Sequence, residues 1–178
     1  FPKLFLLLIE GGKHGNGSIS IQEFAIIEES LDEAIADFKS MKNYLDRHNI
    51  ESLVGAEGGF SPEGFDNSLV LETIKNLFPD KQIAIDIAAT FANSGIDEQN
   101  LLANYNIASI EDPYPEEAWT DWTRFYKQYG GKIMVVKYQA FERDLVKSLT
   151  QAPRNINVDI QLDKNGEAIT YVGYATDG

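Results

Sequence analysis

The chain has 178 residues, the size of about one domain, and 43% of them are hydrophobic, which excludes a disordered or fibrous chain. No apolar run approaches the roughly 20 residues that a membrane span needs. The 28 acidic residues outnumber the 15 lysines and arginines, and this net charge of −13 disfavours nucleic acid and anionic membranes and favours cations. With no cysteine for disulfides or thiolate chemistry, we expect a cytoplasmic protein with one domain over residues 1–178.

Short β-runs and helical patterns alternate along the whole chain. The first run, Leu4–Ile9, leads into Glu10-Gly11-Gly12, which is typical of a buried strand before a loop and not of a secretory signal. The expected strands, in chain order, are Lys3–Ile9, Ser18–Ile27, Glu51–Gly55, Gln82–Ala88, Asn106–Glu111, Lys132–Val136 and Asn155–Leu162.

Four segments carry apolar residues at helical spacing. The first runs from Leu31 to Leu45, and Ser30 with Glu33 three residues later predicts a capping box at its start. The other three helices end before a proline or a glycine, and they run from Leu71 to Phe78, from Trp119 to Tyr129 and from Phe141 to Leu149.

Strands interleaved with helices predict an α/β protein with parallel strands, either a barrel or a doubly wound sheet. Within Gln82–Ala88 the large residues Ile83, Ile85 and Ile87 alternate with Ala84, Asp86 and Ala88. One face therefore packs on helices while the other is small or polar, which favours the interior of a barrel with a site at its mouth.

Acidic residues recur where these strands end. Glu23, Glu57, Asp86 and Glu111 each lie at or near the carboxyl end of a different expected strand, the edge at which α/β barrels build their active sites. Converging carboxylates without cysteine ligands suit a hard cation such as Mg²⁺. Taken singly, each of these acids is better explained as a helix cap or a solvated loop residue.

Two glycine-containing loops add to this pattern. Lys13 and His14 follow Gly11-Gly12 and give a weak indication of anion binding, although a lone histidine such as His14 is more often a surface residue. Glycines on both sides of Glu57, in Gly55-Ala56-Glu57-Gly58-Gly59, indicate a tight backbone that holds this carboxylate in place.

Five segments, in this order, resemble the signatures of enolase: Gly11–Gly15, Ile21–Phe24, Val54–Phe60, Ile85–Ala89 and Ser109–Pro113. The resemblance implies the C-terminal domain of that family, an enolase-like TIM-type barrel. We expect it to be incomplete, with about seven of eight strands, and to lack the last barrel unit and the N-terminal capping domain. The family reaction is the reversible dehydration of 2-phosphoglycerate to phosphoenolpyruvate with Mg²⁺, so both compounds are candidate ligands.

The resemblance also implies roles for individual residues. Asp86 and Glu111 would be metal ligands, Glu57 and Glu23 would be catalytic and serve the departing hydroxyl, and His14 with Lys13 would bind substrate. Such a set is needed because the proton removed is very weakly acidic, so cations must stabilise the enolate while a lysine takes the proton. A separate acid then protonates the leaving hydroxide.

The chain departs from the family pattern at two essential positions. Lys137-Tyr138-Gln139 stands where the family carries Gly-Asp-Asp with the third metal ligand, and Gln161 stands where the family has its base lysine. Lys164 would replace that base only if the register slipped.

These losses leave two readings. We favour a non-catalytic enolase-like scaffold or interaction module in which Mg²⁺ binding is weakened or lost. The alternative is a fragment or divergent form of an active enolase. A different metal-dependent barrel enzyme fits the motif order less well.

An incomplete barrel leaves strand edges that need covering. We expect the apolar strand Lys3–Ile9 and the strand Asn155–Leu162 to lack partners. The gap would close through direct pairing of the two, through Ala168–Tyr174 folding back as a strand, or through a second chain. We expect the last of these, a homo-oligomer or a larger protein assembly.

Overall fold

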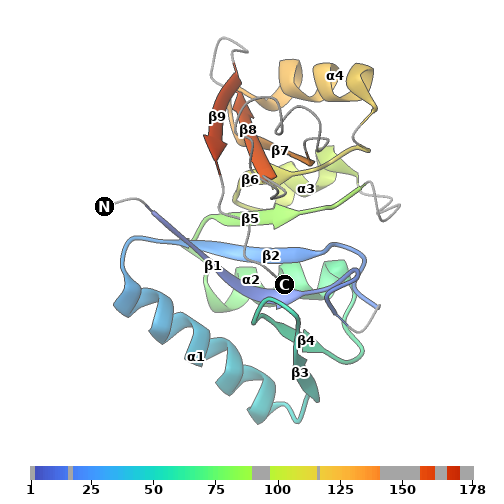
Figure 1. Ribbon diagram of the computed structural model, residues 1–178. Coiled ribbons are helices and arrows are strands. Elements are labelled where there is room, and N and C mark those ends of the chain that lie inside the picture. Colours follow the sequence, from blue (N-terminus) through green and yellow to red (C-terminus); the bar gives the residue numbers. More distant parts are fainter. Residues whose placement is uncertain are drawn as a thin grey trace, which may run out of the picture.

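A computed structural model describes residues 3–15, 18–89, 97–115, 117–140, 157–162 and 168–172 of the chain (Figure 1). These residues form four helices and nine strands. In chain order they are β1 (Leu4–Glu10), β2 (Glu23–Glu28), α1 (Leu31–Arg47), β3 (Ser52–Val54), β4 (Phe60–Pro62), α2 (Asn67–Leu77), β5 (Ile83–Asp86), α3 (Glu98–Asn104), β6 (Ile107–Glu111), α4 (Trp119–Tyr129), β7 (Met134–Ala140), β8 (Asn157–Leu162) and β9 (Ala168–Val172).

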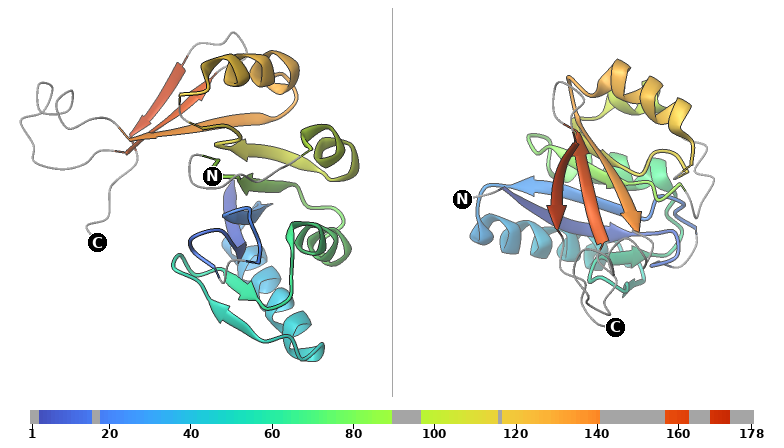
Figure 2. Two further views of the ribbon diagram at one scale, coloured as in Figure 1. Left: turned by 90° about the vertical axis from the view of Figure 1, so that its right-hand side faces the viewer. Right: turned by 45° about the horizontal axis from the view of Figure 1, so that its top comes forward.

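The strands form one sheet in the order β3-β4-β1-β2-β5-β6-β7-β8-β9. Helices α2, α3 and α4 lie along one side of it (Figure 2). This confirms the expected α/β class and an incomplete barrel, since β3 and β9 end the sheet without pairing with each other among the described strands.

The expectation that all strands run parallel is wrong. Strands β5, β6 and β7 pair in parallel, as β1 and β4 do, but β2 is antiparallel to both β1 and β5. The reason lies in the connection from β1 to β2, which doubles back as a hairpin loop. Gly11 N donates to Gln22 O at 2.9 Å and Gly12 N to Ile19 O at 2.7 Å, and a left-handed Gly12 (φ 53°) allows the turn.

Three of the expected helices are confirmed. Helix α1 begins after Ser30, whose hydroxyl accepts a hydrogen bond from Glu33 N at 3.2 Å, as the capping pattern predicts. Helix α3 was not expected, because in seven residues it offers only Leu101 and Leu102 as an apolar stripe. The helix expected from Phe141 to Leu149 lies outside the described residues.

The remaining strand expectations are only partly met. The short strand β4 was missed, and it pairs antiparallel with β3 and parallel with β1 at Ile9 and Phe60. The edge expected at Lys3–Ile9 is therefore partly covered by the chain itself. The C-terminal segment forms β9, which pairs antiparallel with β8. A C-terminal strand is the second of the three ways of closing the gap given above, whereas a second chain was the expected one. It forms here because Ile169, Tyr171 and Val172 are strong β-formers.

The core lies between the sheet and the helices. It contains Phe24 and Ile26 of β2, Ile83 and Ile85 of β5 and Ile110 of β6, all less than 5% exposed. On the other face of β5, Ala84 and Asp86 line a pocket. The alternation predicted within Gln82–Ala88 is thus confirmed, and it directs the polar face of the sheet towards the candidate site.

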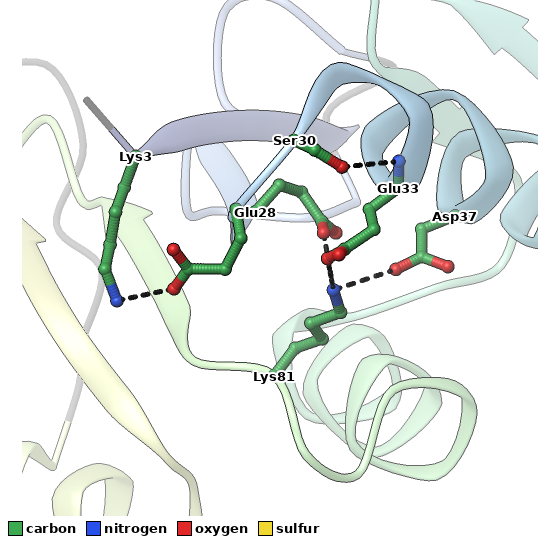
Figure 3. A network of polar contacts seen from close by, with 7 residues as sticks. Lys3, Glu28, Ser30, Glu33, Asp37 and Lys81 are labelled. Atoms are coloured by element: carbon green, nitrogen blue, oxygen red, sulfur yellow. Dashed lines mark hydrogen bonds and ion pairs between the residues drawn. The ribbon is translucent and has the colours of Figure 1, made fainter. Parts of the chain in front are cut away.

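An ion-pair network fixes the end of β2 away from Glu23 (Figure 3). The fully buried Glu28 accepts a hydrogen bond from Lys81 Nζ at 2.5 Å. Lys81 also contacts Glu33 at 2.9 Å and Asp37 at 3.5 Å, both on α1. Burial raises the pKa of Glu28, whereas Lys81 lowers it, so the lysine stabilises the ionised form of this buried carboxylate.

No helix in the described part of the chain combines the length and apolar character needed to cross a membrane.

Candidate active site

Four acidic residues form a row across neighbouring strands. The register pairs Glu10 of β1 with Glu23 of β2, Glu23 with Asp86 of β5, and Asp86 with Glu111 of β6. The row continues through Val136 of β7 to Gln161 of β8. Because residues in one row of a sheet occupy neighbouring positions about 5 Å apart, this register concentrates carboxylates at a single level.

A β-bulge brings Glu10 into this row. The pairing of β1 with β2 shifts between Leu7 and Ile9, so Leu8 is the extra residue. Leu7 is paired with Ala25 and lines the pocket, while Leu8 and Ile9 are both buried in the core. Without the bulge, strand alternation would place Ile9 on the pocket face and Glu10 on the core face.

Glu10 is fully buried and holds the loop that carries Glu57. Its carboxylate accepts hydrogen bonds from Glu57 N at 3.1 Å and 3.2 Å and from Gly59 N at 2.5 Å. A Cβ atom at Gly55 would overlap this carboxylate, and one at Gly59 would lie 2.9 Å from Glu10 Cγ. The tight backbone that the glycines predict is therefore present, and it is packed on Glu10.

The side chains of Glu23 and Glu57 meet above the row. Burial, followed by a side-chain hydrogen bond with Glu57 and by the charges of Glu57, Asp86 and Glu111, raises the pKa of Glu23 from 4.5 to about 9. The geometry therefore keeps one proton on this pair at neutral pH. A carboxyl group that holds a proton at this pH is able to act as a general acid.

Asp86 lies deeper and is held by two donors. Its Oδ1 accepts from Ala88 N at 2.8 Å and its Oδ2 from Gln22 Nε2 at 3.3 Å. Burial outweighs these lowering contacts and raises the pKa of Asp86 to about 6. Just beyond β5 and β6, the backbone adopts left-handed conformations at Ala88 (φ 49°) and Asp112 (φ 40°). The two strand ends are linked by a hydrogen bond from Ala89 N to Asp112 O at 3.0 Å.

The two residues expected to bind substrate lie in one turn. Its backbone is fixed by Gly11 O, which accepts from His14 N at 3.0 Å and from Gly15 N at 2.9 Å. His14 lies with its Nδ1 atom 3.7 Å from Glu57 Oε1, whereas Lys13 is exposed on the same turn. The structure therefore brings His14 to the acidic cluster and leaves Lys13 at its outer side.

A pocket of about 100 Å³ lies beside these acids, and its polar lining consists of Glu23, Asp86, Glu111 and Ser109. Asp86 and Glu111 are adjacent in the row and offer only oxygen ligands, which Mg²⁺ prefers. The donor chemistry of this pair fits a Mg²⁺ ion held by two carboxylates and water. Burial is the main cause of the raised pKa of Asp86 and the charge of Glu57 adds to it, so a nearby cation would favour the ionised form of Asp86.

The predicted convergence of Glu23, Glu57, Asp86 and Glu111 is present, but part of the reason was wrong. Glu23 opens β2 and does not end it, and Glu57 lies in the loop between β3 and β4. Because β2 is antiparallel to its neighbours, its first residue lies at the edge where β1, β5 and β6 end. Sequence reasoning missed Glu10 and Gln22, although Glu10 follows an apolar strand directly, which was the available signal.

Comparison with known proteins places these features in a family. Residues 1–95 match the family model described as "Enolase, C-terminal TIM barrel domain". The chain is 30% identical over 163 aligned positions to an enolase of Elusimicrobium minutum, covering 76% of this chain and 38% of that protein. It is also 30% identical over 186 aligned positions to an enolase of Natranaerobius thermophilus, covering 86% of this chain and 43% of that protein. The chain thus spans about two fifths of the length of these relatives.

Proposed function

Since this chain belongs to the enolase family and matches its C-terminal barrel domain, we propose that it retains the acidic half of the family's site as a non-catalytic scaffold or interaction module. The observation that carries the proposal is the row Glu10, Glu23, Asp86, Glu111, Val136, Gln161. Four of its members are acidic, and the family resemblance puts the base lysine at the position of Gln161, whose amide cannot accept the proton.

The second support comes from β7. The family resemblance puts its third metal ligand in the segment where this chain has Lys137-Tyr138-Gln139, directly after Val136 of the row. A lysine in that segment adds a positive charge where the family has carboxylates. Asp86 and Glu111 would hold Mg²⁺ more weakly as a pair than with a third anionic ligand. When bound, this ion would stabilise negative charge on a substrate carboxylate.

A second function is supported by a specific observation. The ligand atoms of Glu23, Glu57 and His14 lie within 4.8 Å of one another, and the raised pKa of Glu23 would allow it to act as a general acid. This arrangement favours an enolase that dehydrates 2-phosphoglycerate when further chain supplies the missing base. In either reading, 2-phosphoglycerate and phosphoenolpyruvate are the proposed ligands of this pocket.

The test measures turnover and binding separately. Phosphoenolpyruvate formation is followed by absorbance with 2-phosphoglycerate and saturating Mg²⁺, using an active enolase as the positive control. We expect no turnover above background, because losing a proton acceptor and a metal ligand each costs several orders of magnitude. Turnover within tenfold of the positive control would overturn the non-catalytic reading and support the second function.

A matched variant separates true activity from a contaminating host enolase. Any rate that persists unchanged in Asp86→Asn does not come from this chain. Calorimetric titration with Mg²⁺, with and without 2-phosphoglycerate, then measures what the half-site still binds. Mg²⁺ binding that disappears in Asp86→Asn supports the retained half-site, whereas no binding in the parent contradicts it.

We also propose that the chain functions in a homo-oligomer or a larger assembly. Strand β3 pairs only with β4 among the described strands, and it exposes Leu53 (73%) and Val54 (64%) at this edge of the sheet. Apolar edge strands of this kind invite pairing with another chain. Light scattering at micromolar concentration tests this: a stable monomer would contradict it.

A further inference from the structure

One group of side chains near the pocket offers a nitrogen ligand as well as oxygen ligands. His14, Glu23 and Glu57 each place one ligand atom so that all three atoms lie within 4.8 Å of one another. The separation of His14 Nδ1 from Glu57 Oε1 is 3.7 Å. Ligand atoms bound to one Zn²⁺ at about 2.0–2.1 Å in tetrahedral geometry are roughly 3.3–3.5 Å apart. Small side-chain rotations are therefore enough to bring the three atoms around a single ion.

The histidine nitrogen in this group has no hydrogen-bond partner among the described residues. His14 Nδ1 is shielded from solvent, and 3.7 Å from Glu57 is too long for a hydrogen bond. A buried polar atom without a hydrogen-bond partner is destabilising, because it has lost its hydrogen bonds to water. A cation at the centre of the group would accept the lone pair of a neutral imidazole and remove this cost.

The backbone already holds all three ligands in position. His14 is fixed in its turn by Gly11 O, and Glu57 is fixed by the contact of its own N–H with buried Glu10. Glu23 is fixed at the first position of β2 by its pairing with Glu10 and Asp86. Ligands that are ordered before the metal arrives lose little conformational freedom on binding it.

We propose that His14 Nδ1 and one carboxylate oxygen from each of Glu23 and Glu57 form a binding site for Zn²⁺, separate from the Asp86–Glu111 pair. Imidazole with carboxylates suits Zn²⁺, whereas oxygen-only sites suit Mg²⁺. Binding of the ion releases to solvent the proton that Glu23 and Glu57 share, because a carboxylate ligates a metal in its deprotonated form. With three protein ligands, the fourth position is open to water or to an anionic ligand. The charges of Asp86 and Glu111 act on the same region and add to its attraction for a cation. The proposal does not depend on whether the chain turns over 2-phosphoglycerate.

The chain contains only two histidines, so the site can be observed directly. In ¹⁵N-labelled full-length chain, long-range ¹H–¹⁵N spectra follow the ring nitrogens of His14 and His48 while ZnCl₂ is added. We expect His14 Nδ1 to shift with one-to-one stoichiometry and His48 to remain unchanged, since His48 Nδ1 is already 2.8 Å from Tyr44 O. Excess Mg²⁺ should leave the Zn²⁺-bound signal in place. The visible spectrum of bound Co²⁺ gives an independent reading of a four-coordinate site.

Matched variants complete the test. His14→Gln and Glu57→Gln should each weaken Zn²⁺ binding at least tenfold in calorimetry, while His48→Gln should leave it within twofold. The exposed loop position of Glu57 makes its variant a safeguard if His14→Gln alters the fold. Zn²⁺ that leaves the His14 signal in place, that shifts His48 instead, or that binds both site variants as tightly as the parent would overturn the proposal. Phosphoenolpyruvate formation plays no part in this readout, so its outcome stands apart from the proposed function.

Discussion

Glu10 and Glu23 are paired in register across β1 and β2, yet their carboxylates have opposite surroundings. Glu10 is enclosed by backbone N–H donors from Glu57 and Gly59. Glu23 faces other carboxyl groups, and its pKa rises to about 9. Glu10 therefore fixes the loop that carries Glu57, while Glu23 holds a proton that it shares with the Glu57 side chain.

Replacing Glu10 by glutamine should loosen the loop that carries Glu57. A glutamine side chain loses the negative charge that accepts three backbone hydrogen bonds, and hydrogen bonds to charged groups contribute about 1.5–3 kcal/mol. We expect Glu10→Gln to lower the free energy of unfolding by about 2–3 kcal/mol in urea titrations. The amide protons of Glu57 and Gly59 should also exchange faster. The exposed Glu51→Gln is the control and should change neither quantity.

Replacement by alanine should destabilise the protein far more at Gly55 than at Gly58. A Cβ at Gly55 overlaps the Glu10 carboxylate, whereas at Gly58 (φ 100°) no atom lies within 4 Å and only backbone strain opposes it. We expect Gly55→Ala to destabilise by more than about 2 kcal/mol, and Gly58→Ala by about 1 kcal/mol. Thermal unfolding of the two variants side by side measures this. Equal losses would mean that the loop can move away from Glu10.

The protonated Glu23 carboxyl makes stability depend on pH. Below its ordinary pKa of 4.5 the group is protonated in both the folded and the unfolded chain. Between pH 4.5 and about 9 the unfolded chain releases this proton and the folded chain keeps it, so the free energy of unfolding falls as pH rises. Asp86 acts in the same direction up to about pH 6.

Substitution isolates the contribution of Glu23. In Glu23→Gln the loss of stability between pH 5 and pH 8 should shrink by more than about 1.4 kcal/mol, the equivalent of one pKa unit. Denaturant unfolding at several pH values measures it, with the exposed Glu63→Gln as the control. An unchanged pH slope in Glu23→Gln would show that the proton resides elsewhere in the cluster.

Lys81 should be important for stability, unlike most lysines on the surface. Its removal leaves Glu28 buried without a counter-charge, and such losses cost about 3–5 kcal/mol. We expect Lys81→Met to destabilise near the lower end of that range. Lys42→Met removes an exposed pair with Asp46 and should cost below about 0.5 kcal/mol. Comparable losses from both variants would contradict the role of burial.

The acids at the site could be predicted from the sequence, but the direction of their strands could not. Glu23, Asp86 and Glu111 stand out because each adjoins an apolar strand, and that local signal is independent of how strands pair. The antiparallel direction of β2 follows from hydrogen bonds within residues 11–22, and glycine spacing alone does not reveal these. Convergence was thus predicted correctly from a partly incorrect topology.

Glu10 shows what local patterns leave out. It appears in the sequence as the polar end of a strand, and its function depends on Gly59, which lies 49 positions further along the chain. The short elements β4 and α3 were missed for a similar reason, since tertiary contacts stabilise them more than their own residues do.

The bulge at Leu8 has a consequence for how chain length varies among related sequences. If Leu8 were deleted, Leu7, Ile9 and Glu10 would face Ala25, Phe24 and Glu23 in an uninterrupted ladder, and the row would keep its alignment. Leu6 and Leu7 are also leucines, so deleting any one of these three residues gives the same sequence and the same regular ladder. Single-residue gaps in this strand should therefore fall within residues 6–8, where a change of length at the bulge leaves Glu10 paired with Glu23.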